Sequence, residues 1–169
     1  MENVRLKKLI QALQRTRCNA IALNPGATLT YLTGMSFHLM ERPTLLLATR
    51  TGKAAMLLPQ LEAQKLTGSP LKGFFYGDNP AERLDALKAV CAYLGLKNGT
   101  IGVEPTRMRF LEMSLIQQAV PNIEFQSAEG TLTSLRICKD ATEIALMRKA
   151  VEIAQAALAN TLPAITVGV

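Results

Sequence analysis

Short apolar segments alternate with amphipathic ones along most of the chain, and this alternation constrains the fold more than any other feature. We predict strands at 18–23, 43–49, 54–58, 71–76, 100–103 and 123–126, and helices or helical turns at 2–17, 28–34, 61–67, 81–94 and 106–119. Strands that are apolar on both faces need helices on both sides. The pattern therefore predicts an α/β fold with three layers, α/β/α, around a roughly six-stranded sheet. Arg50-Thr51-Gly52-Lys53 is a hairpin turn, which makes the sheet mixed.

The last segment, 138–169, predicts a separate element. Asp140 and Glu143 have the spacing of a helix capping box. An apolar stripe follows at helical spacing: Ile144, Met147, Val151, Ala154 and Leu158. Because no further element follows this helix, we interpret 1–137 as one domain and 138–169 as the start of a truncated second one.

Composition narrows the class of protein. The chain has 169 residues, of which 49% are apolar and 19% charged, which is typical of a globular domain. It has no apolar run long enough to span a bilayer, and its charged N-terminus does not resemble a signal peptide. We therefore expect a cytoplasmic protein without a membrane partner. Three widely spaced cysteines, Cys18, Cys91 and Cys138, indicate buried or half-buried reduced thiols.

The net charge of +6 raises the possibility of a nucleic-acid partner. The basic residues, however, are spread over predicted helix faces and do not alternate with aromatic residues. We interpret them as solvated and expect no nucleic-acid partner.

Residues that could carry chemistry are few. The single histidine, His38, has no metal-binding or catalytic motif around it, and Asp78, Asp85 and Asp140 each fit a turn, a solvated helix face or a helix cap. Phosphate-binding glycine motifs are also absent. The sequence thus predicts no catalytic residues and no metal site in this chain.

The segment 35–43 is the exception to an otherwise ordinary pattern. It carries Phe37, His38, Met40, Glu41 and Arg42, a mixture too polar for a core strand and too apolar for a common loop. One interpretation is an arm that packs on a partner, because apolar groups beside an arginine are typical of interfaces. The other is an ordinary strand with half of these residues buried in the domain.

Several motifs resemble the creatinase/prolidase N-terminal domain. They are Tyr31-Leu32-Thr33-Gly34, Leu57-Leu58-Pro59-Gln60-Leu61-Glu62 and Ile101-Gly102-Val103-Glu104. The most specific is Leu135-Arg136-Ile137, followed by Lys139-Asp140, Glu143-Ile144 and Met147-Arg148-Lys149-Ala150. That string resembles the linker and first helix that lead into the pita-bread catalytic domain of Xaa-Pro dipeptidases and aminopeptidases P.

The resemblance implies a fold, a parent activity and a set of contacts. It implies an α/β domain of the ribonuclease H-like kind, in a homodimeric metallopeptidase that acts on proline-containing peptides. Two divalent metals, Mn, Co or Zn, are implied for the parent enzyme, but none of their five ligands maps onto this sequence. The resemblance also implies that the arm reaches the neighbouring subunit's substrate, through Arg42, with Met40 in place of an aromatic residue and His38 near the entrance.

We therefore expect a non-catalytic N-terminal domain that serves dimerisation and active-site access in trans, inactive by itself. Two alternatives stay open. One is a stand-alone α/β binding or regulatory module without a peptidase half, and the other is the N-terminal domain of a metal-free creatinase-like amidinohydrolase.

Overall fold

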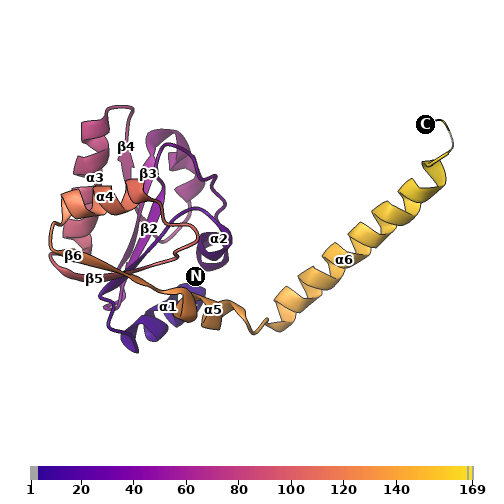
Figure 1. Cartoon of the computed structure of the whole chain (residues 1–169), viewed down its shortest axis with the longest axis horizontal. Helices are drawn as coiled ribbons and strands as arrows, with labels where there is room; N and C mark the ends of the chain where they lie inside the picture. The colour runs from indigo at the N-terminus through magenta and orange to yellow at the C-terminus, as the bar shows by residue number, and fades with distance from the viewer. Residues whose placement is uncertain (1–3, 167, 169) are drawn as a thin grey trace. The chain divides into compact units, whose positions relative to one another are not determined.

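The computed structural model describes residues 4–166 and 168, and the chain divides into two compact units between Leu135 and Arg136 (Figure 1). Each unit is described by itself. The first contains a mixed six-stranded sheet in the order β4-β3-β2-β1-β5-β6. The strands are β1 Ala20–Leu23, β2 Leu45–Thr49, β3 Ala54–Pro59, β4 Lys72–Tyr76, β5 Gly99–Val103 and β6 Ile123–Ser127. Only β2 is antiparallel to its neighbours; the pairs β3–β4, β1–β5 and β5–β6 are parallel.

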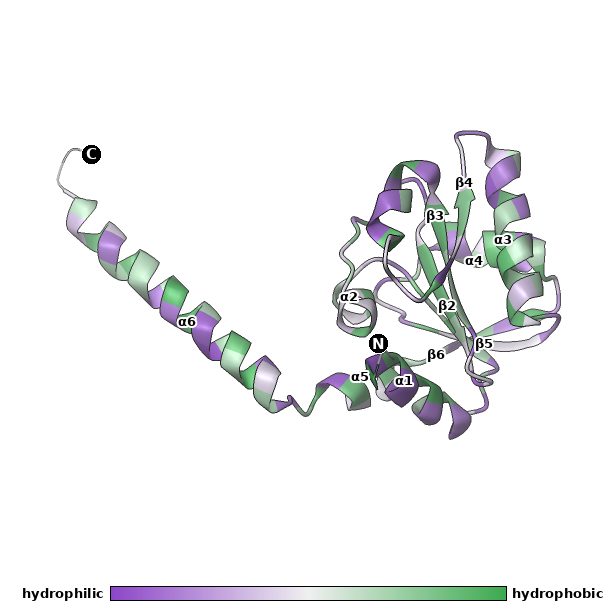
Figure 2. Ribbon diagram, turned by 180° about the vertical axis from the view of Figure 1, so that it is seen from behind, coloured by the Kyte–Doolittle hydropathy of each residue, from purple (hydrophilic) through white to green (hydrophobic). Residues whose placement is uncertain are grey.

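Helices cover both faces of this sheet. They are α1 Val4–Gln14, α2 Ala27–Thr33, the 3-10 helix η1 Gln60–Leu66, α3 Pro80–Leu94, α4 Phe110–Ala119 and α5 Glu129–Arg136. One apolar cluster joins the sheet to α3 and α4, and the other joins it to α1, α2, η1 and α5. Successive strand residues alternate between the clusters, as the two-residue period requires: Leu45 and Leu47 belong to one, and Leu46 to the other. The central strands β1 and β2 are accordingly apolar, except for Thr49 at the end of β2 (Figure 2).

The three-layer α/β/α prediction with a mixed six-stranded sheet is confirmed. Of the two interpretations of segment 35–43, the ordinary strand is excluded, because the segment contains no strand residues. Residues 129–136, which lie outside the predicted helices, form α5. Cys138 is exposed, whereas Cys18 and Cys91 are buried, because only the latter two lie within elements or loops packed on the sheet.

Several loops lie together at one edge of the sheet. Because β1, β3, β4, β5 and β6 run in one direction and β2 in the other, the carboxyl ends of these five strands meet the start of β2. In open α/β sheets, ligands bind at this carboxyl edge. Segment 35–43, which leads into β2, therefore lies at the edge of the sheet where a functional site is expected.

The second unit contains one long helix, α6 Ala141–Thr161, and a short 3-10 helix, η2 Leu162–Ala164. The predicted capping box is confirmed: Asp140 Oδ1 accepts a 2.8 Å hydrogen bond from the Glu143 amide, and Glu143 Oε2 accepts one of 2.9 Å from the Asp140 amide. No side chain of α6 is buried, and its predicted stripe is exposed. Its assignment to a second domain stays a prediction. Among the described residues, no helix is both long and apolar enough to cross a membrane.

Candidate functional site

Segment 35–43, from here on the arm, is held at both ends. Gly34 ends α2 with φ 75°, a left-handed conformation that glycine adopts at little cost, and this turn directs the chain into the arm. Phe37 is buried in the core, with the Lys65 ammonium 5.1 Å from the centre of its ring. At the other end, the Tyr76 hydroxyl donates a 2.8 Å hydrogen bond to the Pro43 carbonyl. The residues between these anchors, 38–41, are exposed.

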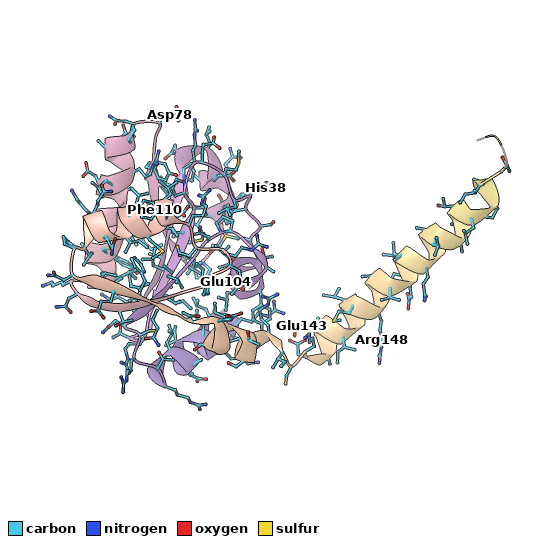
Figure 3. All side chains as sticks on the ribbon, viewed as in Figure 1. His38, Asp78, Glu104, Phe110, Glu143 and Arg148 are labelled. Carbon is cyan, nitrogen blue, oxygen red and sulfur yellow. The ribbon has the colours of Figure 1, made fainter. Side chains whose placement is uncertain are left out.

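The three predicted site residues lie together. His38, Met40 and Arg42 line one pocket of about 260 Å³ at the carboxyl edge. The other lining residues are Glu41 and Thr44 from the arm side, and Pro59, Leu61 and Glu62 from the end of β3 and the start of η1. Figure 3 shows His38 at the periphery of the domain, away from the labelled Glu104. The fold thus brings together the residues that the sequence singled out, and adds a second wall that the sequence did not indicate.

Arg42 forms an ion pair with Asp78. Its Nη2 lies 2.7 Å from Asp78 Oδ1, and the two side chains are 39% and 81% exposed. Exposed ion pairs of this kind contribute little to stability and are easily exchanged. The guanidinium carries further N–H donors in a planar fork that suits a carboxylate. Arg42 can therefore bind a ligand carboxylate without a large loss of folding free energy.

Tyr76 anchors the arm with a neutral hydroxyl. Its side chain is buried, and burial raises its pKa to about 12, although the charges of Arg83 and Arg42 act in the opposite direction. The Arg83 guanidinium lies 5.7 Å from the centre of the Tyr76 ring. At neutral pH the hydroxyl is consequently a permanent donor to the Pro43 carbonyl.

A buried ion pair lies beside this anchor. Glu112 of α4 is 0% exposed, and Arg109 Nε lies 3.0 and 3.1 Å from its two carboxylate oxygens, with Arg109 Nη2 also bonded to Oε1. The hydrogen bond to Glu112 raises the pKa of Arg109. Sequence reasoning missed this pair. The Arg-x-x-Glu spacing at a helix start was the available signal, but it does not tell a buried carboxylate from a solvated one.

Sequence reasoning also missed a polar group where β1 and β5 end. Thr28 donates a 2.8 Å hydrogen bond to Glu104 Oε1, and the Asn24 side-chain amide donates one of 3.1 Å to the Arg107 carbonyl. Among the described residues, Asn24 Oδ1 and Glu104 Oε2 are buried without a hydrogen-bond partner. This group is polar and adjoins α2, but the arm residues do not take part in it.

The metals implied by the resemblance do not fit this part of the protein. Within residues 4–166, no three side chains of His, Cys, Asp or Glu lie close enough together to hold a metal ion. Two bridged metals need several such ligands.

Comparison with known proteins agrees with the fold and the motifs. The family model "Creatinase/Prolidase N-terminal domain" matches residues 5–138. An uncharacterized peptidase of Staphylococcus saprophyticus is 25% identical over 151 residues, which is 89% of this chain and 41% of that protein. The crystal structure of a dipeptidase from Pyrococcus horikoshii OT3 matches with a TM-score of 0.84 and 27% identity, over 95% of this chain and 44% of that one.

A solved Creatinase_N superfamily domain of a Streptococcus thermophilus dipeptidase has the same fold, with a TM-score of 0.69 and 19% identity. The match covers 78% of this chain and 98% of that one. By contrast, the chain spans less than half the length of the staphylococcal peptidase and the Pyrococcus dipeptidase. On the motifs, the fold and the extent of the family match, the chain belongs to the creatinase/prolidase N-terminal domain family.

Proposed function

We propose that this chain is the non-catalytic N-terminal domain of an Xaa-Pro dipeptidase or aminopeptidase P-like metallopeptidase, and that it serves dimerisation and substrate access in trans. The observation that carries the proposal is the family match together with the arm, which holds His38, Met40 and Arg42 in one pocket at the carboxyl edge. The similarity to the Pyrococcus dipeptidase supports a peptidase parent. We also propose a cytoplasmic location, which the three free cysteines support.

In this role the arm supplies Arg42 to the neighbouring subunit's substrate. The anchors at Phe37 and Pro43 restrain the arm, which lowers the entropy cost of contact. Arg42 then exchanges Asp78 for a substrate carboxylate, and His38 and Met40 lie beside it at the entrance. In this proposal, the metals and the residues that bind them belong to the pita-bread catalytic domain of the parent enzyme.

A chimera tests this role. The N-terminal domain of the Pyrococcus dipeptidase is replaced by this chain, because the folds superimpose with a TM-score of 0.84. We expect an active chimera in which Arg42→Gln raises KM for Gly-Pro about 10- to 100-fold, the range for losing a charge-assisted hydrogen bond. Arg17→Gln, an exposed charge near the opposite edge, is the matched control.

A second substrate separates charge recognition from general damage. With Gly-Pro amide, which lacks the carboxylate, Arg42→Gln and the unmodified chimera should have equal KM values, since the interacting partner is already absent. An equal KM for Gly-Pro itself would contradict the proposal. So would dipeptide cleavage by the purified 169-residue chain alone in the presence of manganese.

A further inference from the structure

The pocket beneath the arm is slightly smaller than a typical small-molecule site. Its volume of about 260 Å³ lies just below the roughly 300–1,000 Å³ typical of pockets for drug-sized ligands. One wall is the arm, and the other is formed by Pro59, Leu61 and Glu62. Both walls belong to the first unit of this chain, so the pocket is present in the chain alone.

The pocket offers both signs of charge and an apolar wall. Arg42 contributes a cation, Glu41 and Glu62 contribute carboxylates, and Met40, Pro59 and Leu61 contribute apolar surface. The charges do not pair with each other: Arg42 pairs with Asp78, and Glu62 Oε2 lies 2.7 Å from Lys65 Nζ. A ligand that carries one positive and one negative group on a small apolar body complements this lining.

Contacts around the pocket hold the two walls in place. Lys65 links them, because its ammonium pairs with Glu62 on η1 and also lies over the ring of Phe37 in the arm. The Tyr76 hydroxyl fixes the Pro43 carbonyl, between the lining residues Arg42 and Thr44. A pocket preorganised in this way binds a small ligand without paying for the ordering of a loop.

We propose that this pocket is a binding site for a small zwitterion of the α-amino acid class, held by the isolated domain. The ligand carboxylate binds the Arg42 guanidinium, the ligand ammonium binds between Glu41 and Glu62, and an apolar side chain contacts Met40, Pro59 and Leu61. Such a site lets a free amino acid bind to the same arm that the proposed function assigns to substrate access. Binding requires neither a catalytic domain nor a second subunit.

Titration of the 169-residue chain followed by amide NMR tests the site, with L-leucine and L-proline as probes. We expect saturable shifts in the arm and in 59–62, with half-saturation below about 10 mM. N-acetyl-L-leucine lacks the ammonium and L-leucinamide lacks the carboxylate, and each should bind at least about tenfold more weakly because one charged contact is lost.

Variants locate the two contacts. Arg42→Gln should abolish discrimination against L-leucinamide, and Glu62→Gln should weaken discrimination against N-acetyl-L-leucine. Arg17→Gln and Glu124→Gln, exposed outside the pocket, should change neither. Absence of saturable shifts with both amino acids, or equal affinity for the parent and blocked probes, overturns the site. Because the measurement uses the chain alone, failure here is distinguishable from failure of Arg42 to affect KM in the chimera.

Discussion

The hydroxyl of Tyr76 donates a 2.8 Å hydrogen bond to the carbonyl of Pro43, 33 residues earlier in the chain. This bond joins the carboxyl end of β4 to the last residue of the arm. It explains why a segment without regular structure occupies a defined place beside the sheet, since the donor is buried and cannot exchange its partner for water.

Replacement of Tyr76 by Phe should release the end of the arm. The change removes one hydrogen bond and leaves a carbonyl unsatisfied, which costs about 1–3 kcal/mol of unfolding free energy. Urea denaturation measures this cost. Tyr76→Phe should also exchange amide hydrogens faster than wild type in 38–44, while exchange in β6 stays unchanged. Tyr93→Phe, at an exposed position on α3, is the control and should change neither measurement. Equal exchange in the arm for wild type and Tyr76→Phe would refute the anchoring role.

Stability at high pH should depend on the same side chain. The folded-state pKa of Tyr76 is raised from 10.0 to about 12, so the folded state holds the phenol proton more tightly than the unfolded state does. The contribution of the protonated Tyr76 hydroxyl to the free energy of unfolding is complete below pH 10 and is lost as the pH rises towards 12. The free energy of unfolding should therefore fall more steeply between pH 10 and 12 in wild type than in Tyr76→Phe, as urea titrations at fixed pH would show. Parallel pH profiles for the two proteins would contradict the assignment.

The two partners of the buried ion pair should differ in their mutational cost. Arg109→Ala leaves Glu112 as an unpaired carboxylate with no exposure, which costs about 3–5 kcal/mol. Glu112→Ala leaves Arg109, whose side chain is 31% exposed and can reach water, and should cost less, about 1–3 kcal/mol. Thermal or urea unfolding of both variants measures the order, and the reverse order would show that α4 rearranges. Glu152→Ala, at an exposed pair on α6, should cost under about 0.5 kcal/mol.

Gly34 should be difficult to replace, because of its backbone conformation and not because of crowding. An added Cβ would meet no atom within 4 Å, but φ is 75°. Gly34→Ala should therefore destabilise the domain by about 1 kcal/mol. Gly130→Ala is the matched control: it also meets no atom, has no positive φ and lies in α5, so it should be neutral or stabilising. Equal stability of both variants would exclude the conformational explanation.

The capping box should stabilise the start of α6 locally. Asp140→Ala removes the acceptor for the Glu143 amide and should cost about 1 kcal/mol, or a roughly fivefold faster opening of the first turn. Hydrogen exchange at residues 141–145 measures the effect, with Glu152→Ala on the same helix as the control. If both variants exchange at the wild-type rate, the cap contributes nothing in solution.

Local features of this protein could be predicted from the sequence. The strands and the helix cap at Asp140 depend on neighbours within a few residues. The arm was recognised by its mixed composition, and its candidate residues do lie in one pocket. The spacing of those residues did not indicate whether the arm was a strand, because the arm is held by side chains far away in sequence. Tyr76 bonds the Pro43 carbonyl, and Lys65 lies over the Phe37 ring.

The sequence by itself determined the α/β class, the position of every α-helix except α5, and the family motifs, since hydrophobic period and cap chemistry act over one or two turns. Only the tertiary structure decided which loops share the carboxyl edge, that Glu62 and Arg42 line the same pocket, and that Glu112 is buried while paired with Arg109. These relationships arise from strand order and close packing, which bring together residues whose separation in the chain carries no periodic signal.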